Sequence, residues 1–452
     1  MQQRFDLIVE GGIVVTPTAQ GKRDIAIRDG CFVAMGKRGA FSRDIVAERL
    51  DARDCHVMTG VIDGHVHFRD PGFPDKEDFR SGSLAAITGG VSTVLDMPNT
   101  DPPTDSVARA ADKLERASAV WCDVGLFGLV VDTSIDELAP MAEAGLVVGF
   151  KAFLGPTTGG LPAPSDATLR RAMAIIRSSG KRLAVHAEDE TIVATATARL
   201  RATGRTDGLV HPESRPVQAE VAAIERIGAL AMATGCPVHI VHLSSRDGLD
   251  AIERWRARGV DMTCEVSANH LFLAAEDMDT IGPRMKMNPP VRLRSEGHGE
   301  ALLRGLALGI VDMVASDHAP HTAAEKLGGD IWSAHAGAVG VETSPAVLLS
   351  RAIQRDPRID LQRFVQVTSS EPARIWGLRD KGRLAVGADA DLTVWRLDRE
   401  MRIDEERLHG RSSLSPFRGE HLLGYPDATI IRGRIVMRNG EPVGSPGGRA
   451  VG

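Results

Sequence analysis

The middle of the chain repeats one pattern, in which a short apolar run is followed by a longer stretch with helical spacing. The clearest such stretch, residues 216–234, begins with Pro216, is followed by Gly235 and carries its apolar residues on one face. Strands that alternate with helices favour a parallel sheet. Eight apolar runs predict an α/β fold, a (β/α)₈ TIM barrel, with a doubly wound sheet as the alternative. The runs are residues 57–63, 92–97, 124–131, 147–154, 182–186, 237–242, 261–266 and 312–317.

Both ends of the chain differ from this middle, because they read as short strands between glycine-rich turns. The expected strands are residues 5–10, 12–16, 24–28, 31–35, 390–395 and 428–436. Since the termini of a domain often lie close together, we expect one small β domain built from both ends. The predicted division is 1–56 and 379–452 for this domain and 57–378 for the barrel, with a frayed tail from Ser445 onward.

The charge balance is mildly acidic. The chain has 54 Lys and Arg against 60 Asp and Glu, a net charge of −6, which excludes a broad basic face for nucleic acid. The five cysteines form no C-x-x-C pair, which argues against a disulfide framework and favours a reducing compartment. No signal peptide is recognisable, and no apolar stretch approaches the ~18 residues of a membrane span. These features predict a cytoplasmic protein with no nucleic-acid partner and no membrane segment.

Residue types that bind metals stand where the predicted strands end. His65 and His67 follow the first run at a spacing of two, so both side chains face the same side of a strand. The fifth, sixth and eighth runs end at His186, His242 and Asp317. In a barrel, the carboxyl ends of all strands open on one face, where active sites lie. We therefore expect these five side chains to converge on metal, although any one of these histidines taken alone reads better as a core residue.

Five nitrogen and oxygen ligands exceed the three that one catalytic zinc uses, which favours two metal ions ~3.5–4 Å apart. Such a pair needs a bridging anion. Lys151 lies between apolar neighbours in the fourth run (GFKAF), where burial lowers the pKa of an ammonium group. Its neutral amine can react with carbon dioxide to give a carbamate, a bridge with two oxygens. The alternative is a lysine whose stem packs in the core while its ammonium reaches a carboxylate.

Ordered motifs along nearly the whole chain resemble the dihydroorotases of the amidohydrolase superfamily. They begin with DGHVHFRDPGFPDKEDF at residues 63–79, DMPNT at 96–100 and HAED at 186–189. They continue with MNPPVR at 287–292, SDHAPHT at 316–322 and the closing KGRL, GADADL and IRG segments of cyclic amidohydrolases. Some bacterial dihydroorotases have aspartate at the bridge. The lysine of GFKAF therefore resembles hydantoinases, dihydropyrimidinases, allantoinases and the lysine-bridged dihydroorotases.

The resemblance implies a site with two zinc ions. The implied ligands are His65, His67 and Asp317 for one ion, His186 and His242 for the other, and carboxylated Lys151 as the bridge. Asp317 is also the implied catalytic residue, which accepts a proton from a metal-bridging hydroxide and passes it to the leaving ring nitrogen. The family further implies that the domain built from both chain ends is β-sandwich-like. It also implies a homo-oligomer, either a dimer or a tetramer.

The same resemblance predicts the substrate. The implied substrate-binding residues are Arg69, Asn99, Asn288 and His321. A guanidinium suits a bidentate grip on a carboxylate, which dihydroorotate carries and which hydantoin, dihydrouracil and allantoin lack. We therefore predict a dihydroorotase of pyrimidine biosynthesis that interconverts dihydroorotate and N-carbamoyl-aspartate. The structural alternative for Arg69 is a surface ion pair with Asp70 or Glu77.

Two segments depart from the dihydroorotase pattern and keep other functions open. Residues 214–216 (SRP) resemble hydantoinases and allantoinases, and residues 268–269 stand where relatives often carry Pro-His. The alternative function is therefore a hydantoinase, dihydropyrimidinase or allantoinase acting on another cyclic ureide. An alternative from another class is a non-catalytic amidohydrolase-fold subunit. The glycines of residues 321–340 predict either a mobile lid over the metals or an ordinary loop.

Overall fold

In the computed structural model, which describes residues 4–42, 44–157 and 160–452, eight parallel strands form a nearly closed barrel. The strands follow one another in chain order, and the barrel closes where the His67 N–H donates to the His318 carbonyl at 2.8 Å. This architecture confirms the predicted barrel. The strands are β6 (Val61–Val66), β7 (Val91–Asp96), β8 (Asp123–Leu129), β9 (Gly149–Phe153), β10 (Leu183–His186), β11 (Val238–Ile240), β12 (Met262–Val266) and β13 (Met313–Val314).

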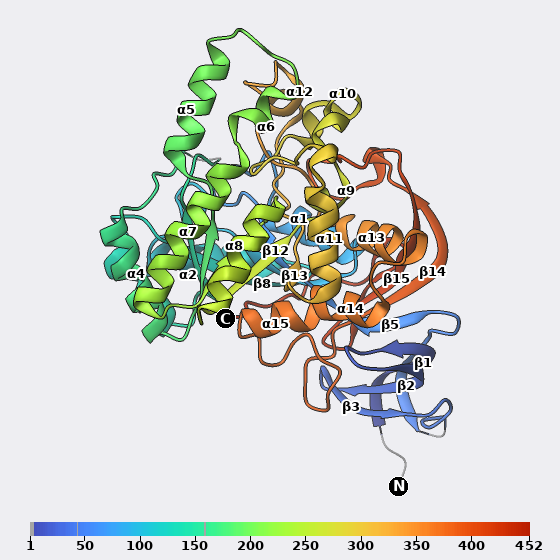
Figure 1. The fold of residues 1–452 in the computed structure, drawn as a ribbon. Coiled ribbons are helices and arrows are strands. Elements are labelled where there is room, and N and C mark those ends of the chain that lie inside the picture. The colour runs from blue at the N-terminus through green and yellow to red at the C-terminus, as the bar shows by residue number, and fades with distance from the viewer. Residues whose placement is uncertain (1–3, 43, 158–159) are drawn as a thin grey trace.

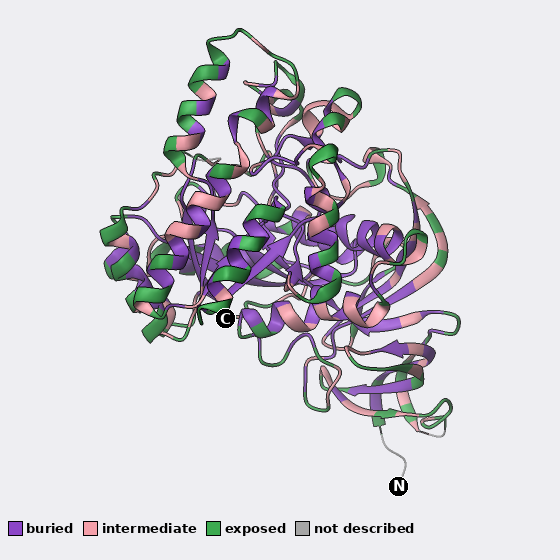
Figure 2. Ribbon diagram, viewed as in Figure 1, coloured by how far each residue is buried: buried purple, intermediate pink, exposed green. Residues whose placement is uncertain are grey.

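Helices surround the barrel, and those at the top of Figure 1 stand over its carboxyl end. Their outward faces are exposed, whereas the barrel strands are buried (Figure 2). Among the residues that the structure describes, none of the helices has the length and apolar character needed to cross a lipid bilayer. The helices are α1 (Phe79–Thr88), α2 (Val107–Arg116), α3 (Leu138–Glu143), α4 (Asp166–Ser178), α5 (Glu190–Arg201), α6 (Val210–Ser214), α7 (Val217–Thr234), α8 (Arg246–Ala257), α9 (Ala268–Phe272), α10 (Met278–Ile281), α11 (His298–Leu308), α12 (Ala323–Leu327), α13 (Ser344–Leu349), α14 (Leu361–Val365) and α15 (Glu371–Ile375).

Local sequence signals set the helix ends. Pro216 precedes α7, and Gly235 ends it in the left-handed conformation at a φ of 68°, as predicted. For α2, Thr104 and Ser106 are both residue types that can cap the start of a helix, and Ser106 does so. The Ser106 hydroxyl accepts from the N–H of Arg109 at the first turn, whereas Thr104 is buried in the preceding loop.

A second sheet combines both ends of the chain, as predicted (Figure 1). Its centre is β5, which pairs with β14 on one side and with β1 on the other. The strands are β1 (Arg4–Val15), β2 (Gln20–Arg28), β3 (Cys31–Gly36), β4 (Ile45–Asp51), β5 (His56–Thr59), β14 (Leu392–Arg402), β15 (His421–Ile431), β16 (Arg434–Arg438) and β17 (Glu441–Pro442).

In three places the chain is divided into strands differently from the sequence prediction. Residues 57–63 do not form one barrel strand, because the strand is interrupted at Gly60. The residues before Gly60 belong to β5, which joins the second sheet, and those after it belong to the barrel strand β6. A side chain at Gly60 would lie 2.3 Å from the Ser92 hydroxyl, so the break packs closely against β7. Residues 5–16 form one bulged strand rather than two, and residues 428–436 form two strands separated by a turn. The proposed division into 1–56, 57–378 and 379–452 stays a prediction.

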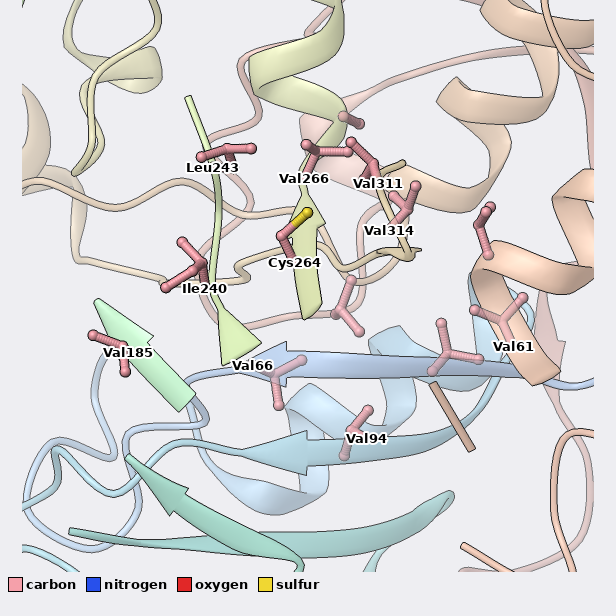
Figure 3. Close-up of a cluster of buried hydrophobic side chains, with 14 of the residues drawn as sticks. Val61, Val66, Val94, Val185, Ile240, Leu243, Cys264, Val266, Val311 and Val314 are labelled. Atoms are coloured by element: carbon pink, nitrogen blue, oxygen red, sulfur yellow. The ribbon is translucent and has the colours of Figure 1, made fainter. Parts of the chain in front are cut away.

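Two hydrophobic clusters fill the barrel region. The larger one lies between strands and helices, and Figure 3 shows its strand side with Val94, Val185 and Val266 labelled. The other cluster contains Phe127 and Trp376, whose rings meet edge to face at 4.7 Å. The His239 ring lies 5.1 Å from the same tryptophan. Trp376 follows α15 directly, so the last helix of the barrel positions the aromatic ring that packs against Phe127 and His239.

The C-terminal tail is not frayed, which corrects the sequence prediction. The Val124 N–H donates to the Arg449 carbonyl and the Val451 N–H donates to the Val124 carbonyl, both at 2.9 Å, so the tail pairs with β8. A buried ammonium lies nearby. The Lys381 Nζ donates to Asp123 at 2.6 Å and to Asp391 at 2.7 Å, which joins the end sheet to the barrel.

Candidate active site

The residues predicted as metal ligands gather around one cavity at the carboxyl end of the barrel. The cavity holds about 30 Å³. His65 belongs to β6, His186 ends β10, and Asp317 follows β13 by three residues. Parallel strands therefore bring residues that are far apart in the chain to one place, as expected. The cavity is lined by His65, His67, Arg69, Asn99, Phe153, Thr157, His186, His242, Asn288, Asp317, Ala319, Ala336 and Gly337.

One group of ligand atoms is formed by His65, His67 and Asp317. The Nε2 atoms of the two histidines lie 3.4 Å and 3.5 Å from the same carboxylate oxygen, Asp317 Oδ1. All three residues are buried, and their ligand atoms lie within 4.8 Å of one another. Two imidazoles and a carboxylate at this spacing suit a zinc-type ion.

A second pair of ligand atoms lies beside this group. His186 Nδ1 and His242 Nε2 are 2.9 Å apart, and both side chains are buried. The His242 ring lies 5.3 Å from the His65 ring, so the two sets adjoin. The five predicted imidazole and carboxylate ligands thus form two neighbouring sets, as a two-metal site requires.

Lys151 lies on β9 and is completely buried. Its Nζ has no hydrogen-bond partner among the residues that the structure describes, and it lies over the Phe153 ring, 5.0 Å from the centroid. Burial lowers the pKa of Lys151 to about 7. The charge of Lys151 affects the pKa values of His186, His242 and Asp317, so the amine lies close to these residues. An unpaired buried amine in this position fits a lysine that is carboxylated between two metals.

Buried carboxylates orient two of the histidines. Glu265, on β12, accepts from Nδ1 of His65 at 2.6 Å and from Nε2 of His239 at 3.1 Å. Glu188 accepts from Nε2 of His186 at 2.9 Å and is held in turn by Arg215. A carboxylate accepts only, so these contacts leave His65 Nε2 and His186 Nδ1 as the nitrogens that offer lone pairs to a metal.

The electrostatics agree with this assignment. Burial lowers the pKa of His67 to about 3 and also lowers the pKa values of His186 and His242, so the imidazoles are neutral, the form that binds metals. Burial alone would raise the pKa of the Asp317 carboxyl, but His65 and His67 outweigh it and the pKa is lowered. Asp317 is therefore ionised and able to accept a proton.

Three residues around the cavity adopt left-handed backbone conformations. The φ angles are 60° for Arg69, 38° for His242 and 50° for Asp317. Each such conformation costs a non-glycine residue ~1–3 kcal/mol and is found most often where a site requires it. The strain therefore falls on residues that direct their side chains into the cavity.

Three of the four residues predicted to bind substrate line the cavity. Arg69 is buried, and its Nε donates to the Pro320 carbonyl at 3.3 Å, which argues against the alternative of a surface ion pair with Asp70 or Glu77. Asn99 Oδ1 accepts from His67 Nδ1 at 2.7 Å. Asn288 Oδ1 is buried without a partner among the described residues. His321 does not line the cavity.

Part of the cavity lining comes from loop residues, including Thr157, Ala336 and Gly337. Gly337 has a φ of 147°, and a side chain there would lie 2.4 Å from the Ala319 carbonyl oxygen. The segment of residues 321–340 therefore contributes a wall of the site, while its mobility stays a prediction.

Sequence reasoning gave no role to several of the supporting residues. His239 and Arg215 each bind a carboxylate that holds a metal-ligand histidine, and Asp63 accepts from the N–H of Ser316 at 3.0 Å. Asp63 and His239 do lie on strands with an inward-facing side chain, which is the signal available in the sequence. Nothing local marks their partners.

Comparison with known proteins agrees with this geometry. The model of the amidohydrolase family matches residues 56–436. An allantoinase from Solibacter usitatus is 38% identical over 98% of this chain and 96% of its own, and a dihydroorotase from Halobacterium salinarum is 39% identical over 88% and 90%. A solved L-hydantoinase (dihydropyrimidinase) from Arthrobacter aurescens superposes with a TM-score of 0.95 at 33% identity over 99% of both chains. The chain therefore belongs to the amidohydrolase family and is a hydrolase of cyclic amides.

Proposed function

We propose that this chain is a dinuclear zinc enzyme that opens a cyclic ureide of the allantoin or hydantoin kind. The observation that carries the proposal is the convergence of His65, His67, Lys151, His186, His242 and Asp317 at one end of the barrel. When bound there, two zinc ions joined by carboxylated Lys151 would polarise a ring carbonyl and lower the pKa of a water molecule.

The residues of the chain would then handle the proton and the ring. A carboxylate oxygen of Asp317 accepts a proton from the attacking water. Asp317 then delivers this proton to the leaving ring nitrogen. The free Asn288 Oδ1 is an acceptor for a ring N–H. Glu188 and Glu265 hold His186 and His65 in one tautomer each, so ligand geometry does not change during turnover.

The choice of ring is supported by two features. The solved L-hydantoinase and the allantoinase both match this chain almost end to end. The SRP segment, which resembles hydantoinases and allantoinases, contributes Arg215 to the support of His186. Dihydroorotase, the main sequence prediction, is therefore less well supported than the alternative that the same sequence kept open.

Dihydroorotate remains a second candidate because of Arg69. This guanidinium lines the cavity and is buried. Among the described residues it donates one hydrogen bond, from Nε to the Pro320 carbonyl, which leaves its two terminal nitrogens available for a carboxylate. Since His321 lies outside the cavity lining, we assign carboxylate binding in that candidate to Arg69 with Asn99 rather than to His321.

A turnover panel with the zinc-loaded enzyme separates the candidates. Allantoin, a 5-substituted hydantoin, dihydrouracil and dihydroorotate are compared by kcat/KM. The proposal expects allantoin or a hydantoin to exceed dihydroorotate at least tenfold, and the reverse order would refute it in favour of the second candidate. Absence of turnover with every ring in zinc-saturated protein would favour a non-catalytic subunit.

The variant Arg69→Met, with Arg69→Lys as its control, gives a second separation. In the dihydroorotase candidate, Met lowers kcat/KM for dihydroorotate at least ~100-fold, because a buried charge partner is worth ~2–5 kcal/mol. Lys restores part of that loss, since it keeps the charge without the fork. In the main proposal, neither variant changes turnover of the uncharged ring more than a fewfold.

A further inference from the structure

A second cluster of potential metal ligands lies outside the cavity, around the short helix α12. His321 precedes this helix, Glu325 lies within it, and His335 follows it. The distances are 3.8 Å from His321 Nδ1 to Glu325 Oε2 and 3.7 Å from His335 Nδ1 to Glu325 Oε1. The rings of the two histidines meet edge to face with centroids 5.0 Å apart. None of the three residues lines the catalytic cavity.

The buried histidine of this cluster offers a lone pair toward the carboxylate. The Ala336 carbonyl can only accept, so His321 Nε2 carries the proton that donates to it at 3.0 Å. Burial, followed by the charge of Arg69, lowers the pKa of His321, so the ring is neutral and Nδ1 is unprotonated. The His321 side chain has no exposed surface, and its Nδ1 has no hydrogen-bond partner among the described residues.

His321 is buried and the Glu325 side chain is 27% exposed. Two acceptors that face each other, one of them buried, repel unless a cation lies between them. Nitrogen and oxygen ligands of tetrahedral zinc lie ~2.0–2.2 Å from the metal, which sets neighbouring ligand atoms ~3.4 Å apart. The observed 3.7 Å and 3.8 Å are a few tenths longer. His335 is 44% exposed and free to adjust, so the cluster can close around an ion.

The surroundings match a metal site in two further ways. A metal-ligand histidine usually donates its other N–H to a carbonyl or carboxylate, as His321 does to Ala336. Glu325 is anchored, because its Oε2 accepts from the N–H and hydroxyl of Thr322, both at 3.0 Å. A cationic group, the Lys76 ammonium, already lies 2.8 Å from Glu325 Oε1. An ion would therefore compete with Lys76 for this carboxylate.

We propose that His321, Glu325 and His335 form a third divalent-metal site, of the zinc type, separate from the catalytic pair. Two histidines and one carboxylate are a common zinc ligand set with a fourth position open to water. Because His335 directly precedes Ala336 and Gly337, which line the cavity, an ion bound here would tie this part of the wall to His321 and Glu325. Divalent metal in excess of the catalytic pair would then stabilise residues 321–340 in the position in which Ala336 and Gly337 line the cavity.

The test uses zinc-loaded enzyme from which loosely held metal has been removed. It is titrated with Co²⁺, while visible absorption reports tetrahedral cobalt and metal analysis of the same samples confirms that the catalytic zinc is retained. The wild-type protein is expected to bind one Co²⁺ per chain that His335→Gln does not bind. His409→Gln is the matched control, because His409 is also a partly exposed histidine beside a carboxylate, Glu342, at 2.8 Å.

Two more variants keep the test independent of any one substitution. Glu325→Gln should weaken Co²⁺ binding at least tenfold. Lys76→Met should strengthen it severalfold, because the competing ammonium is gone. The proposal is overturned if the wild-type protein takes up no Co²⁺ beyond its zinc, or if His335→Gln binds Co²⁺ as the His409→Gln control does. Weaker binding in Lys76→Met would also contradict the assignment of Glu325 as a ligand.

Discussion

Removing Arg215 is expected to destabilise the protein and to loosen the metal ligand His186 at the same time. The Arg215 Nε lies 3.0 Å and 3.1 Å from the two oxygens of Glu188, and its Nη2 donates to the Pro156 carbonyl at 2.8 Å. The Glu188 side chain has no exposed surface. In Arg215→Met the carboxylate stays buried without its partner, which costs ~3–5 kcal/mol of stability.

The metal site responds separately. The hydrogen bond of His186 is strongest while Glu188 is ionised and held in place, and loss of such support weakens metal binding ~10–100-fold. A second substitution separates the two effects. In Arg215→Met/Glu188→Gln no charge is left unpaired, so most of the stability returns, while a neutral amide remains a weaker acceptor for His186. Unfolding in denaturant and zinc competition with a chelator measure the two quantities.

The pH dependence of stability gives a sign to check. In the wild-type protein, burial would raise the pKa of Glu188, but Arg215 and His186 outweigh it and lower the pKa. The ionised carboxylate therefore stabilises the folded protein at pH values above 4.5, its ordinary pKa, and this stability is lost in acid. In Arg215→Met, we expect burial to raise the pKa of Glu188 above its ordinary value of 4.5. Stability should then fall as the pH rises from 4.5 through the raised pKa. Two results would refute this reasoning. The free energy of unfolding of Arg215→Met could lie within ~1 kcal/mol of the wild-type value, or Arg215→Met/Glu188→Gln could be no more stable than Arg215→Met.

Other predictions follow from the same contacts. Lys151→Ala should leave fewer than two zinc ions per chain and reduce turnover at least ~100-fold, as metal analysis and kinetics would show. Burial lowers the pKa of Lys151 to about 7, so the neutral amine prevails above that pH and the ammonium below it. Rebuilding of metal-free protein with zinc and bicarbonate should therefore run ~10-fold faster at pH 8 than at pH 6, and equal rates would contradict carboxylation. Gly337→Ala places a side chain 2.4 Å from the Ala319 oxygen and should raise KM ~10-fold or more; an unchanged KM would show that the wall yields. Lys381→Met leaves Asp391 buried and unpaired and should cost ~3–5 kcal/mol in denaturant unfolding, unless the carboxyl is already neutral.

The barrel and its ligand set could be predicted because both depend on the spacing of residues that are close together in the sequence. A strand has a period of two, so His65 and His67 share a face, and parallel strands present their carboxyl ends together. The same rule brought His186 and Asp317 to the site. Each of these inferences needs only the order of residues near one strand end.

The supports of the site could not be predicted in this way. Glu265 meets His65 across 200 residues of sequence, and Arg215 meets Glu188 across 27. The left-handed backbone at Asp317 depends on neighbours from other strands, and so does the position of His321 outside the cavity. The substrate was predicted from the presence of Arg69, whereas its selection depends on the shape of a cavity assembled from several loops.

The central position of β5 in the second sheet has a consequence during synthesis. One edge of this strand pairs with β1 as soon as both leave the ribosome, but the other edge pairs with β14. Leu392 follows Thr59 by 333 positions, so at ~5–20 residues per second that edge stays unpaired for ~17–67 s. An open strand edge recruits other chains. We expect nascent chains that stop before β14 to aggregate, and the full-length chain to be most vulnerable until its last sixty residues have been translated.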